Sequence, residues 1–495
     1  MKDISRKLII LLVWIGISQL CFSQTQKGAD INGVAPADHF GFSVSMPDAN
    51  TIAIGAMEND GNGNYSGQVQ IYIWNGSAWI QKGVDIYGES DMDWSGYSVS
   101  MPDANTVAIG APLGKEDFHS RNGYVRIYKW NGSAWVQKGE NIYGEPSRGV
   151  SGWSVSMPDA NTVAIGDPDN TPPGFLTSND YSGHVRIFYW DGTEWRQKGM
   201  DIDSGEGGNR FGWSVSMPDA NTIAIGAIWG SMYSGYVRVY KWEGSAWIQI
   251  GSDILGEATS DYSGYSVSMP DINTVAIGAP SNDGNGDKSG HVRVYEWNGN
   301  EWFQKGTDID GKAVEDKSGS SVSMPDSNTL AIGASYNNSN TGHVRIYNWN
   351  GNQWIQRGID IDGKLPGDKS GCSVCMPDAN TVGIGAYTAN KVNGALGTGQ
   401  VRIFSLNPLD LVEGSLTEKF KSYPNPTTGH VIIEFDNIQR FVKLSLFTLS
   451  QQLIKKESYK NSQSIQFDCS VPNGLYLLIV EDDQNRKSII KLTKE

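Results

Sequence analysis

The sequence predicts an all-β protein: a seven-bladed β-propeller followed by a small C-terminal β-sandwich. The first observation is a nine-residue string, SVSMPDANT, whose identical or near copies start at Ser43, Ser98, Ser154, Ser214, Ser266, Ser321 and Ser373. Copies that start 52 to 60 residues apart are typical of propellers, solenoids and arrays. The second observation is that no segment shows sustained helical periodicity, while short alternating runs and Gly-rich turns are frequent.

Each copy divides into four short strands. In the second copy we expect them at residues 96–101, 106–111, 123–130 and 134–142. The first two strands are joined by the turn Pro-Asp-Ala-Asn, and the last two by the hairpin Asn-Gly-Ser-Ala. Seven units of four strands describe a propeller with seven blades, within the usual four to eight.

The two ends of the repeated region complement each other. The seventh copy stops after residues 399–406 and lacks the hairpin and the fourth strand. The missing fourth-strand signature, Gln-Lys-Gly, occurs instead in residues 26–33. We therefore predict a propeller over residues 24–407, in which the N-terminal strand latches the last blade and leaves no open end.

Residues that recur in every copy are expected to build the blades. A Trp precedes each of six hairpins and another follows it, and we expect these twelve side chains to pack between blades. A sugar-stacking role for them is the alternative. We expect the histidines of the recurring Gly-His-Val-Arg to be scaffold residues as well; they are His184, His291 and His343.

The N-terminus has the pattern of a secretory signal peptide. Basic residues precede an apolar run from Leu8 to Ile17, and small or polar residues follow. We predict a signal peptide over residues 1–23; a membrane anchor is the alternative, but the run is short for a bilayer span. The chain is therefore expected to be exported and not membrane-spanning. Its net charge of −15 argues against a nucleic-acid partner, because phosphate binding needs clustered Lys and Arg.

Few cysteines remain after the predicted cleavage. Cys372 and Cys375 have the spacing of a redox or zinc motif, but they lie within the seventh copy of a predicted strand. Residues i and i+3 of a strand point to opposite faces, so we expect the two thiols to diverge.

The segment GFSVSMPDANTIAIGA, residues 41–56, resembles the FG-GAP repeat known from the propeller of integrin α subunits. The resemblance covers residues 24–407 and implies a propeller that binds an extracellular ligand with loops on one face. Integrin-type repeats often hold calcium in an acidic loop between the first two strands. Here that loop is reduced to Pro-Asp-Ala-Asn or a close variant, so calcium is not expected at that place.

Acidic residues return in the loop between the second and third strands. Asp283, Asn285 and Asp287 have Asp-x-Asn-x-Asp spacing, and Asp60 and Asn62 imitate it in the first copy. Oxygen ligands at alternate positions with interleaved glycines are able to wrap a hard cation, so we name these residues as candidate Ca²⁺ ligands. The alternative is an ordinary Gly/Asn/Asp turn.

The composition changes near Phe420, where the repeat ends. The segment YPNPTTG, residues 423–429, and the closing Gly-Leu-Tyr with a Lys-rich last strand resemble the C-terminal sorting domain of the type IX secretion system. We predict a linker at residues 408–419 and a sorting domain at residues 420–495. The resemblance implies that the type IX machinery is a partner, and that the cargo is secreted or held at the cell surface once signal and sorting segments are removed.

No catalytic constellation interrupts the repeat, so we expect no enzyme activity. His39 and His119 lie outside the repeated histidine position, but neither belongs to a recognisable catalytic motif. The loops between the second and third strands vary most, and they share one face of the ring with the loops between blades. On that face Trp94 and Trp229 stand outside the repeat, and we name them with flanking tyrosines as candidate ligand-binding residues; the tyrosines are Tyr65, Tyr181, Tyr233 and Tyr262.

The predicted function is that of an exported, non-enzymatic binding or adhesion propeller whose ligand is an extracellular glycan or protein. The alternatives are a secreted enzyme acting on polysaccharide and a structural surface protein. An enzyme would need a pair of acids outside the repeat that line one pocket, and the sequence offers no clear pair.

Overall fold

The computed structural model describes residues 22–117, 120–145, 149–170, 181–389, 397–408, 420–448, 453–482 and 487–495. Nearly all of the predicted signal peptide and linker, and also His119, lie outside the described residues. The described residues form two compact units, the propeller and the C-terminal strands.

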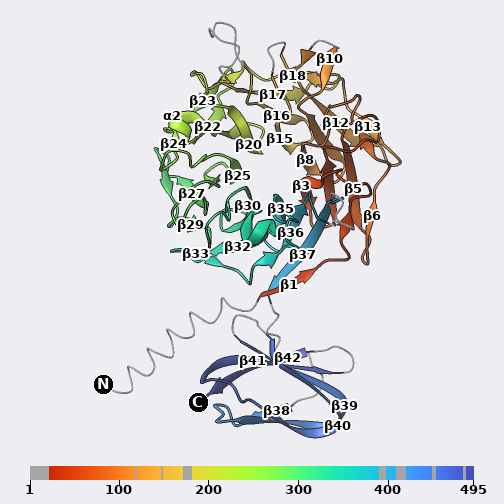
Figure 1. Cartoon of the computed structure of the whole chain (residues 1–495), viewed down its shortest axis with the longest axis vertical. Coiled ribbons are helices and arrows are strands. Elements are labelled where there is room, and N and C mark those ends of the chain that lie inside the picture. Colours follow the sequence, from red (N-terminus) through yellow and green to blue (C-terminus); the bar gives the residue numbers. More distant parts are fainter. Residues whose placement is uncertain are drawn as a thin grey trace. The chain divides into compact units, whose positions relative to one another are not determined.

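The seven-bladed propeller is confirmed. Seven five-stranded antiparallel sheets form a ring, with the first strand of each blade innermost (Figure 1). The first three blades comprise β3 (Phe40–Asp48), β4 (Thr51–Ala56), β5 (Gln68–Trp74), β6 (Trp79–Gln81) and β7 (Ile86–Tyr87); β8 (Ser98–Asp103), β9 (Thr106–Ala111), β12 (Tyr124–Trp130), β13 (Trp135–Gln137) and β14 (Ile142–Tyr143); and β15 (Ser154–Asp159), β16 (Thr162–Asp167), β17 (His184–Trp190), β18 (Trp195–Gln197) and β19 (Ile202–Asp203).

The remaining four blades follow the same order. They comprise β20 (Phe211–Asp219), β21 (Thr222–Ala227), β22 (Tyr236–Trp242), β23 (Trp247–Gln249) and β24 (Ile254–Leu255); β25 (Ser266–Asp271), β26 (Thr274–Ala279), β27 (His291–Trp297), β28 (Trp302–Gln304) and β29 (Ile309–Asp310); β30 (Ser321–Asp326), β31 (Thr329–Ala334), β32 (His343–Trp349), β33 (Trp354–Gln356) and β34 (Ile361–Asp362); and β35 (Ser373–Asp378), β36 (Thr381–Ala386) and β37 (Gln400–Pro408) with β1 (Phe22–Gln26) and β2 (Ile31–Asn32). Three short elements decorate the loops: β10 (Lys115–Asp117) with β11 (Ser120–Arg121), α2 (Gly230–Tyr233) and α3 (Asn337–Asn340).

The prediction of one continuous fourth strand is wrong. Each fourth strand is divided into two short pieces that pair with different parts of the third, as β13 and β14 pair with β12. The break falls at Gly139, whose φ of +79° is readily adopted only by glycine. A Cβ there would lie 2.7 Å from Trp190 of the next blade, so this glycine lets the next Trp pair pack closely.

The two serines of the repeated string join neighbouring blades. The hydroxyl of Ser43 donates to the carbonyl of Gly96 in the next blade at 2.7 Å, and Ser45 accepts the N–H of Met101 at 2.9 Å. Residues two apart on a strand point the same way, so both reach the same neighbour. The first bond recurs from Ser98, Ser154, Ser214, Ser266, Ser321 and Ser373, and the second at Ser100, Ser156, Ser216, Ser268 and Ser323.

The Gln-Lys-Gly segment, present in five of the seven blades, contacts the following blade; the fourth and sixth blades carry Ile250 and Arg357 in place of the Lys. The ammonium of Lys82 donates to the carbonyl of Ala104 at 2.6 Å and the side chain of Asn105 at 2.8 Å, both in the Pro-Asp-Ala-Asn turn of the next blade. The same ammonium lies over Trp130 and Trp135, 5.2 Å from each ring centre, and Trp135 Nε1 donates to the Lys82 carbonyl at 2.8 Å. The recurring Trp pair, Lys and Asn thus form one junction.

The N-terminal segment completes the seventh blade. β1 and β2 both pair with β37, with Ile31 opposite Val401 (Figure 1). Lys27 N donates to the Ile403 carbonyl at 2.7 Å, while the Lys27 ammonium bonds the turn of the first blade at Ala49. The first residues of the propeller therefore hold its last blade and clasp its first.

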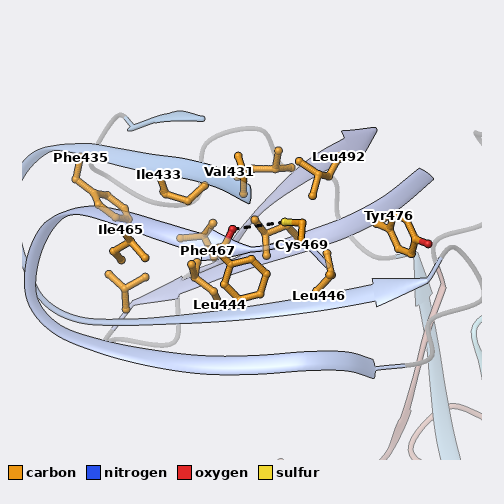
Figure 2. Packing of buried hydrophobic residues seen from close by; sticks show 14 residues of the cluster. Val431, Ile433, Phe435, Leu444, Leu446, Ile465, Phe467, Cys469, Tyr476 and Leu492 are labelled. Atoms are coloured by element: carbon orange, nitrogen blue, oxygen red, sulfur yellow. Dashed lines mark hydrogen bonds between the residues drawn. The ribbon is translucent and has the colours of Figure 1, made fainter. Parts of the chain in front are cut away.

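The C-terminal part is a small all-β unit. It comprises β38 (Phe420–Tyr423), β39 (His430–Thr448), β40 (Leu453–Asp468), β41 (Gly474–Asp482) and β42 (Lys487–Lys494). One hydrogen-bonded sheet runs β38-β39-β41-β42, with β40 along β39, and the ladder is interrupted between Glu434 and Gln439. The two halves of β39 thereby place Ile433 and Leu444 in one apolar core with Phe467 (Figure 2).

Candidate ligand-binding pocket at the channel mouth

One position of the repeat lies at the mouth of the central channel and differs from blade to blade. It is the residue just before the innermost Ser-Val-Ser strand, where the otherwise constant string carries large and small side chains. The seven residues, in blade order, are Phe42, Tyr97, Trp153, Trp213, Tyr265, Ser320 and Cys372.

The five aromatic members form a continuous arc. Ring centroids are 5.0 Å apart from Phe42 to Tyr97, 4.5 Å from Tyr97 to Trp153 and 4.7 Å from Trp153 to Trp213. Tyr265 closes the series at 5.6 Å from Trp213. These separations lie within the range of favourable aromatic pairs, so one side of the mouth is filled.

The other side of the mouth is hollow because its two residues are small. Ser320 and Cys372 leave a cavity of about 320 Å³, lined also by Lys317 and by five aromatic rings. The rings come from four blades and are Phe42, Tyr262, Tyr265, Tyr336 and Tyr387. An aromatic cavity of this size lies at the lower end of the range for small-molecule sites.

One lysine, Lys317, lines this pocket, and a second, Lys369, lies beside two of its aromatic rings. The ammonium of Lys317 lies 4.1 Å from the ring centre of Tyr336, and that of Lys369 lies 5.1 Å from the same centre. Lys369 also donates to the Tyr387 hydroxyl at 2.7 Å. Burial by itself lowers the pKa of Lys369, but the Tyr387 hydrogen bond and the electrostatic effects of Tyr387, Tyr336 and Cys372 together exceed it, so the pKa is raised. The lysine is therefore charged at neutral pH.

Two of the predicted ligand-binding residues meet, but they contact other protein groups. Tyr181 and Trp229 pack edge to face at 6.0 Å. The guanidinium of Arg210 lies 3.9 Å above the Trp229 ring and pairs with Asp169 at 3.2 Å. One face of Trp229 is thus covered, as expected of a residue that seals a blade edge.

Trp229 nevertheless begins an aromatic row that leads to the pocket. Tyr233 lies 5.8 Å from Trp229 and 6.5 Å from Tyr262, which lines the cavity. Tyr233 is exposed. The loop face therefore carries rings both inside the cavity and along its approach.

The other two predicted residues lie near the filled side. Trp94 stacks on Tyr97 of the arc at 6.1 Å with nearly parallel rings. Tyr65 is exposed, and its carbonyl accepts the N–H of Trp94 at 3.1 Å. Trp94 and Tyr65 are thus neighbours, whereas the cavity opens beside blades six and seven.

The candidate calcium loops are organised by their own hydrogen bonds. The Asp283 carboxylate accepts the N–H of Lys288 at 2.8 Å, and Asp60 accepts that of Tyr65 at 2.7 Å. The amides of Asn285 and Asn62 each donate to a glycine carbonyl of the following loop at 2.8 Å. Asp287 lies 3.9 Å from the Lys288 ammonium, which disfavours a cation there. These contacts fit turn-forming roles better than a calcium cage.

The three repeated histidines are buried beside acids of the outer strands. His291 Nδ1 lies 3.7 Å from Asp308, and His343 Nδ1 lies 3.7 Å from Asp360. Each histidine, His184 included, belongs to a group of three residues whose ligand atoms lie within 4.8 Å of one another. At the same position of the first blade, Gln68 donates to Asp85 at 2.6 Å. This shared pattern favours a scaffold role; burial lowers the pKa of His291 to about 4 and keeps it neutral.

The two neighbouring cysteines have separate surroundings. Cys372 lines the channel cavity, whereas Cys375 packs against the apolar core between the seventh and first blades. Both are free, and burial raises the pKa of Cys372 to about 11 and that of Cys375 to about 12. Both thiols are therefore protonated at neutral pH and poor nucleophiles.

Sequence reasoning missed the arc and the pocket. It treated residues inside the repeat as scaffold and searched for aromatics outside it. The available signal was variation at a fixed position: the residue between Gly and Ser-Val-Ser changes from Trp153 to Ser320 while its neighbours stay constant. Lys317 and Lys369 occupy a second such position, three residues earlier.

None of the helices in the described part of the chain has the length and apolar character of a membrane-spanning segment.

Comparisons with known proteins support both predicted parts. Residues 29–72 match the FG-GAP repeat, and residues 421–495 match the secretion system C-terminal sorting domain. No curated protein matches the sequence.

Solved structures share the propeller architecture only distantly. The periplasmic gluconolactonase of Pseudomonas aeruginosa is 11% identical with a TM-score of 0.43, covering 66% of this chain and 86% of that one. The β-propeller domain of the Trilobed protease from Pyrococcus furiosus is 12% identical with a TM-score of 0.41, covering 74% and 98%. A xyloglucanase from Xanthomonas campestris is 11% identical with a TM-score of 0.42, covering 84% and 60%. At these TM-scores the comparisons carry no argument about function. The chain thus has a seven-bladed propeller, of which residues 29–72 match the FG-GAP repeat, and a C-terminal sorting domain that indicates type IX export to the cell surface or the medium.

Proposed function

We propose that the propeller is a non-enzymatic binding protein that captures an extracellular glycan at its channel mouth. The observation that carries this proposal is the aromatic cavity formed where Ser320 and Cys372 replace the large residues of the other five blades. A sugar ring presents apolar C–H faces and polar edges, which suits rings such as Tyr265 and Tyr336 with hydroxyls and ammoniums beside them.

A glycan is favoured over a protein ligand by the form of the site. Stable protein interfaces need about 800 Å² from each partner, with a broad apolar centre. The mouth instead offers a narrow cavity of about 320 Å³ with an aromatic row along its approach. A single sugar unit or a chain end suits such a site better than a folded surface.

The chemistry of the cavity favours binding over catalysis. Among the described residues, its lining contains no Asp, Glu or His, the usual general acids and bases of sugar chemistry. Burial raises the pKa of Tyr387, although the Lys369 hydrogen bond opposes this, so its phenol stays protonated at neutral pH and is not available as a general base. The exported-enzyme alternative would require an acid pair brought from elsewhere.

The proposal is tested by filling the cavity. The full chain and the variant Ser320→Trp/Cys372→Tyr are compared on a polysaccharide array and by titration calorimetry. Trp and Tyr already stand at this position in other blades, so we expect the variant to fold. We expect it to lose measurable glycan binding, and no reducing ends to be released by either protein.

A Trp added elsewhere is the matched control. Ser133 is exposed in the hairpin of the second blade, which lies on the opposite face of the ring, so Ser133→Trp should bind like the unaltered chain. Undiminished binding by the filled variant would contradict the proposal. Binding only to proteins would favour the adhesion alternative with a protein ligand.

A further inference from the structure

We propose, building on the proposed glycan-binding function, that the sugar recognised at the channel mouth carries a negative charge, as a carboxylate or a sulfate. The two lysines of blades six and seven are the groups that would recognise it. An anionic sugar carries a charged substituent next to a ring that is able to stack on an aromatic side chain. The protein likewise holds lysine ammoniums next to the aromatic ring of Tyr336.

The lysines are positioned rather than free on the surface. Lys317 and Lys369 occupy the same position in adjacent blades, and each has a positive φ, 52° and 54°, that is unusual for a side-chain-bearing residue. Both ammoniums lie within 5.1 Å of the Tyr336 ring centre. An anion bound beside that ring would be attracted by both ammoniums.

No protein carboxylate takes the place of that anion in the described part of the chain, where neither lysine forms an ion pair. The nearest acids in sequence are occupied: Asp316 accepts the N–H groups of Lys312 and Ala313, and Asp368 accepts those of Lys364 and Leu365. Both carboxylates are buried. Neither ammonium is therefore neutralised by a described carboxylate; Lys317 lines the cavity, and Lys369 donates to Tyr387, which also lines it.

The pocket is a positive site on a negative protein. The chain has a net charge of −15, so polyanions are not attracted to its surface in general. The corresponding positions of other blades carry His39, Trp94, Val150, Arg210 and Tyr262, and Arg210 is already paired with Asp169. Unpaired cationic side chains therefore coincide with the two blades that open the cavity.

The experiment uses matched pairs of polysaccharides that differ only in charge. The full chain is titrated with polygalacturonate and its methyl ester, and with dextran sulfate and dextran, at low and high salt. We expect the charged member of at least one pair to bind, its neutral partner to bind at least tenfold more weakly, and added salt to weaken binding. The two pairs distinguish carboxylate from sulfate.

The lysines are tested by Lys317→Gln and Lys369→Gln. Each should weaken binding of the charged polymer roughly tenfold to a hundredfold, as expected for a lost charge-assisted hydrogen bond. Lys241→Gln removes an equal charge from an exposed side chain of β22 in the fourth blade and should change nothing.

The outcomes separate this inference from the proposed function. Binding that is lost on filling the cavity, but is equal for charged and neutral polymers or insensitive to both lysine variants, would overturn the anionic sugar alone. Binding to none of the four polymers would overturn it as well. Charged-polymer binding that survives in the filled variant would overturn both proposals, because the lysines would then act as a general charge patch.

Discussion

The blade junctions and the channel mouth follow opposite rules in the same repeat. At the junctions the same serines and tryptophans recur in most blades, and the lysine in five of seven, because each contacts a neighbouring blade, as Ser43 does with Gly96 and Trp135 with Lys82. At the mouth the residue type changes from blade to blade, from Trp153 to Ser320. A position that is constant in the repeat therefore identifies structure, whereas a position that varies within it identifies the place left for a ligand.

The largest expected effect comes from removing the junction that closes the ring. Deletion of residues 24–33 takes away β2 and Lys27, which bonds both Ile403 and Ala49. We expect the melting temperature of the full chain to fall by about 10 °C or more, since a whole blade edge is exposed. Calorimetry measures the change.

Two controls make the latch test specific. A chain whose residues 24–33 are replaced by a Gly/Ser segment should behave like the deletion, while a synthetic peptide of residues 22–33 should restore much of the lost stability by adding a strand. A melt that the deletion leaves unchanged would refute ring closure by this segment.

Matched Trp substitutions sharpen the comparison of junction and mouth. Trp135→Phe removes the indole N–H that donates to the Lys82 carbonyl and should cost about 1–3 kcal/mol of unfolding free energy. Trp153→Phe keeps an aromatic ring in the arc and removes no hydrogen bond to another described residue. It should therefore lower the unfolding free energy by less than about 1 kcal/mol. Urea titration measures both. Equal costs would remove the distinction between the two regions.

A further prediction concerns the pH dependence of stability. The pKa of His291 and of His343 is lowered from 6.5 to about 4 chiefly by burial, so the folded state holds them neutral. Between pH 6.5 and about 4 the unfolded chain binds more protons, and stability falls as pH falls, by up to about 1.4 kcal/mol per pH unit for each histidine. Above pH 6.5 the histidines are neutral in both the folded and the unfolded state, so they no longer make stability depend on pH.

The pH effect is isolated by changing both histidines to the residue of another blade. His291→Gln/His343→Gln copies Gln68, which bonds Asp85, and should flatten the dependence of the urea midpoint on pH between 7 and 5. His430→Gln, at an exposed histidine of the C-terminal part, should leave the slope as it was. Parallel slopes in all three proteins would mean that other groups control acid stability.

The smallest effect is expected for calcium. Asp283→Asn keeps an oxygen that accepts the Lys288 N–H, and we expect the melting temperature to shift by about 1 °C or less with calcium, with chelator or with this substitution. A calcium-dependent rise that disappears in Asp283→Asn/Asp287→Asn would support the calcium prediction for these loops.

The fold was predictable from the sequence because each blade is encoded by a local pattern of strands and turns, and this pattern recurs in seven copies. Alternating strands and Pro-Asp-Ala-Asn turns indicated the blades, and the early end of the seventh copy pointed to residues 26–33. The division of each fourth strand was not foreseen, because it depends on the Trp pair of the next blade approaching glycines such as Gly139.

The pocket was harder to predict for a physical reason. Ser320, Cys372 and Phe42 are far apart in sequence and become neighbours only when the ring closes. Trp94 and Trp229 were chosen because they stand outside the repeat, yet Trp229 is covered by Arg210, whereas the cavity is formed by small residues at a repeated position. A cavity formed because small residues replace large ones is difficult to recognise in a single sequence.

The N-terminal latch also determines when the propeller is able to close during synthesis of the chain. Asp30 and Gln400 are 370 residues apart yet share a hydrogen bond, so the propeller is unable to close until nearly all of it has been synthesised. The first strand must stay unpaired while six blades are made, and the sorting domain is the next segment to follow. The propeller is thus able to close only shortly before the sorting domain is synthesised. A chain truncated before this point would have an open propeller and would also lack the sorting domain needed for export.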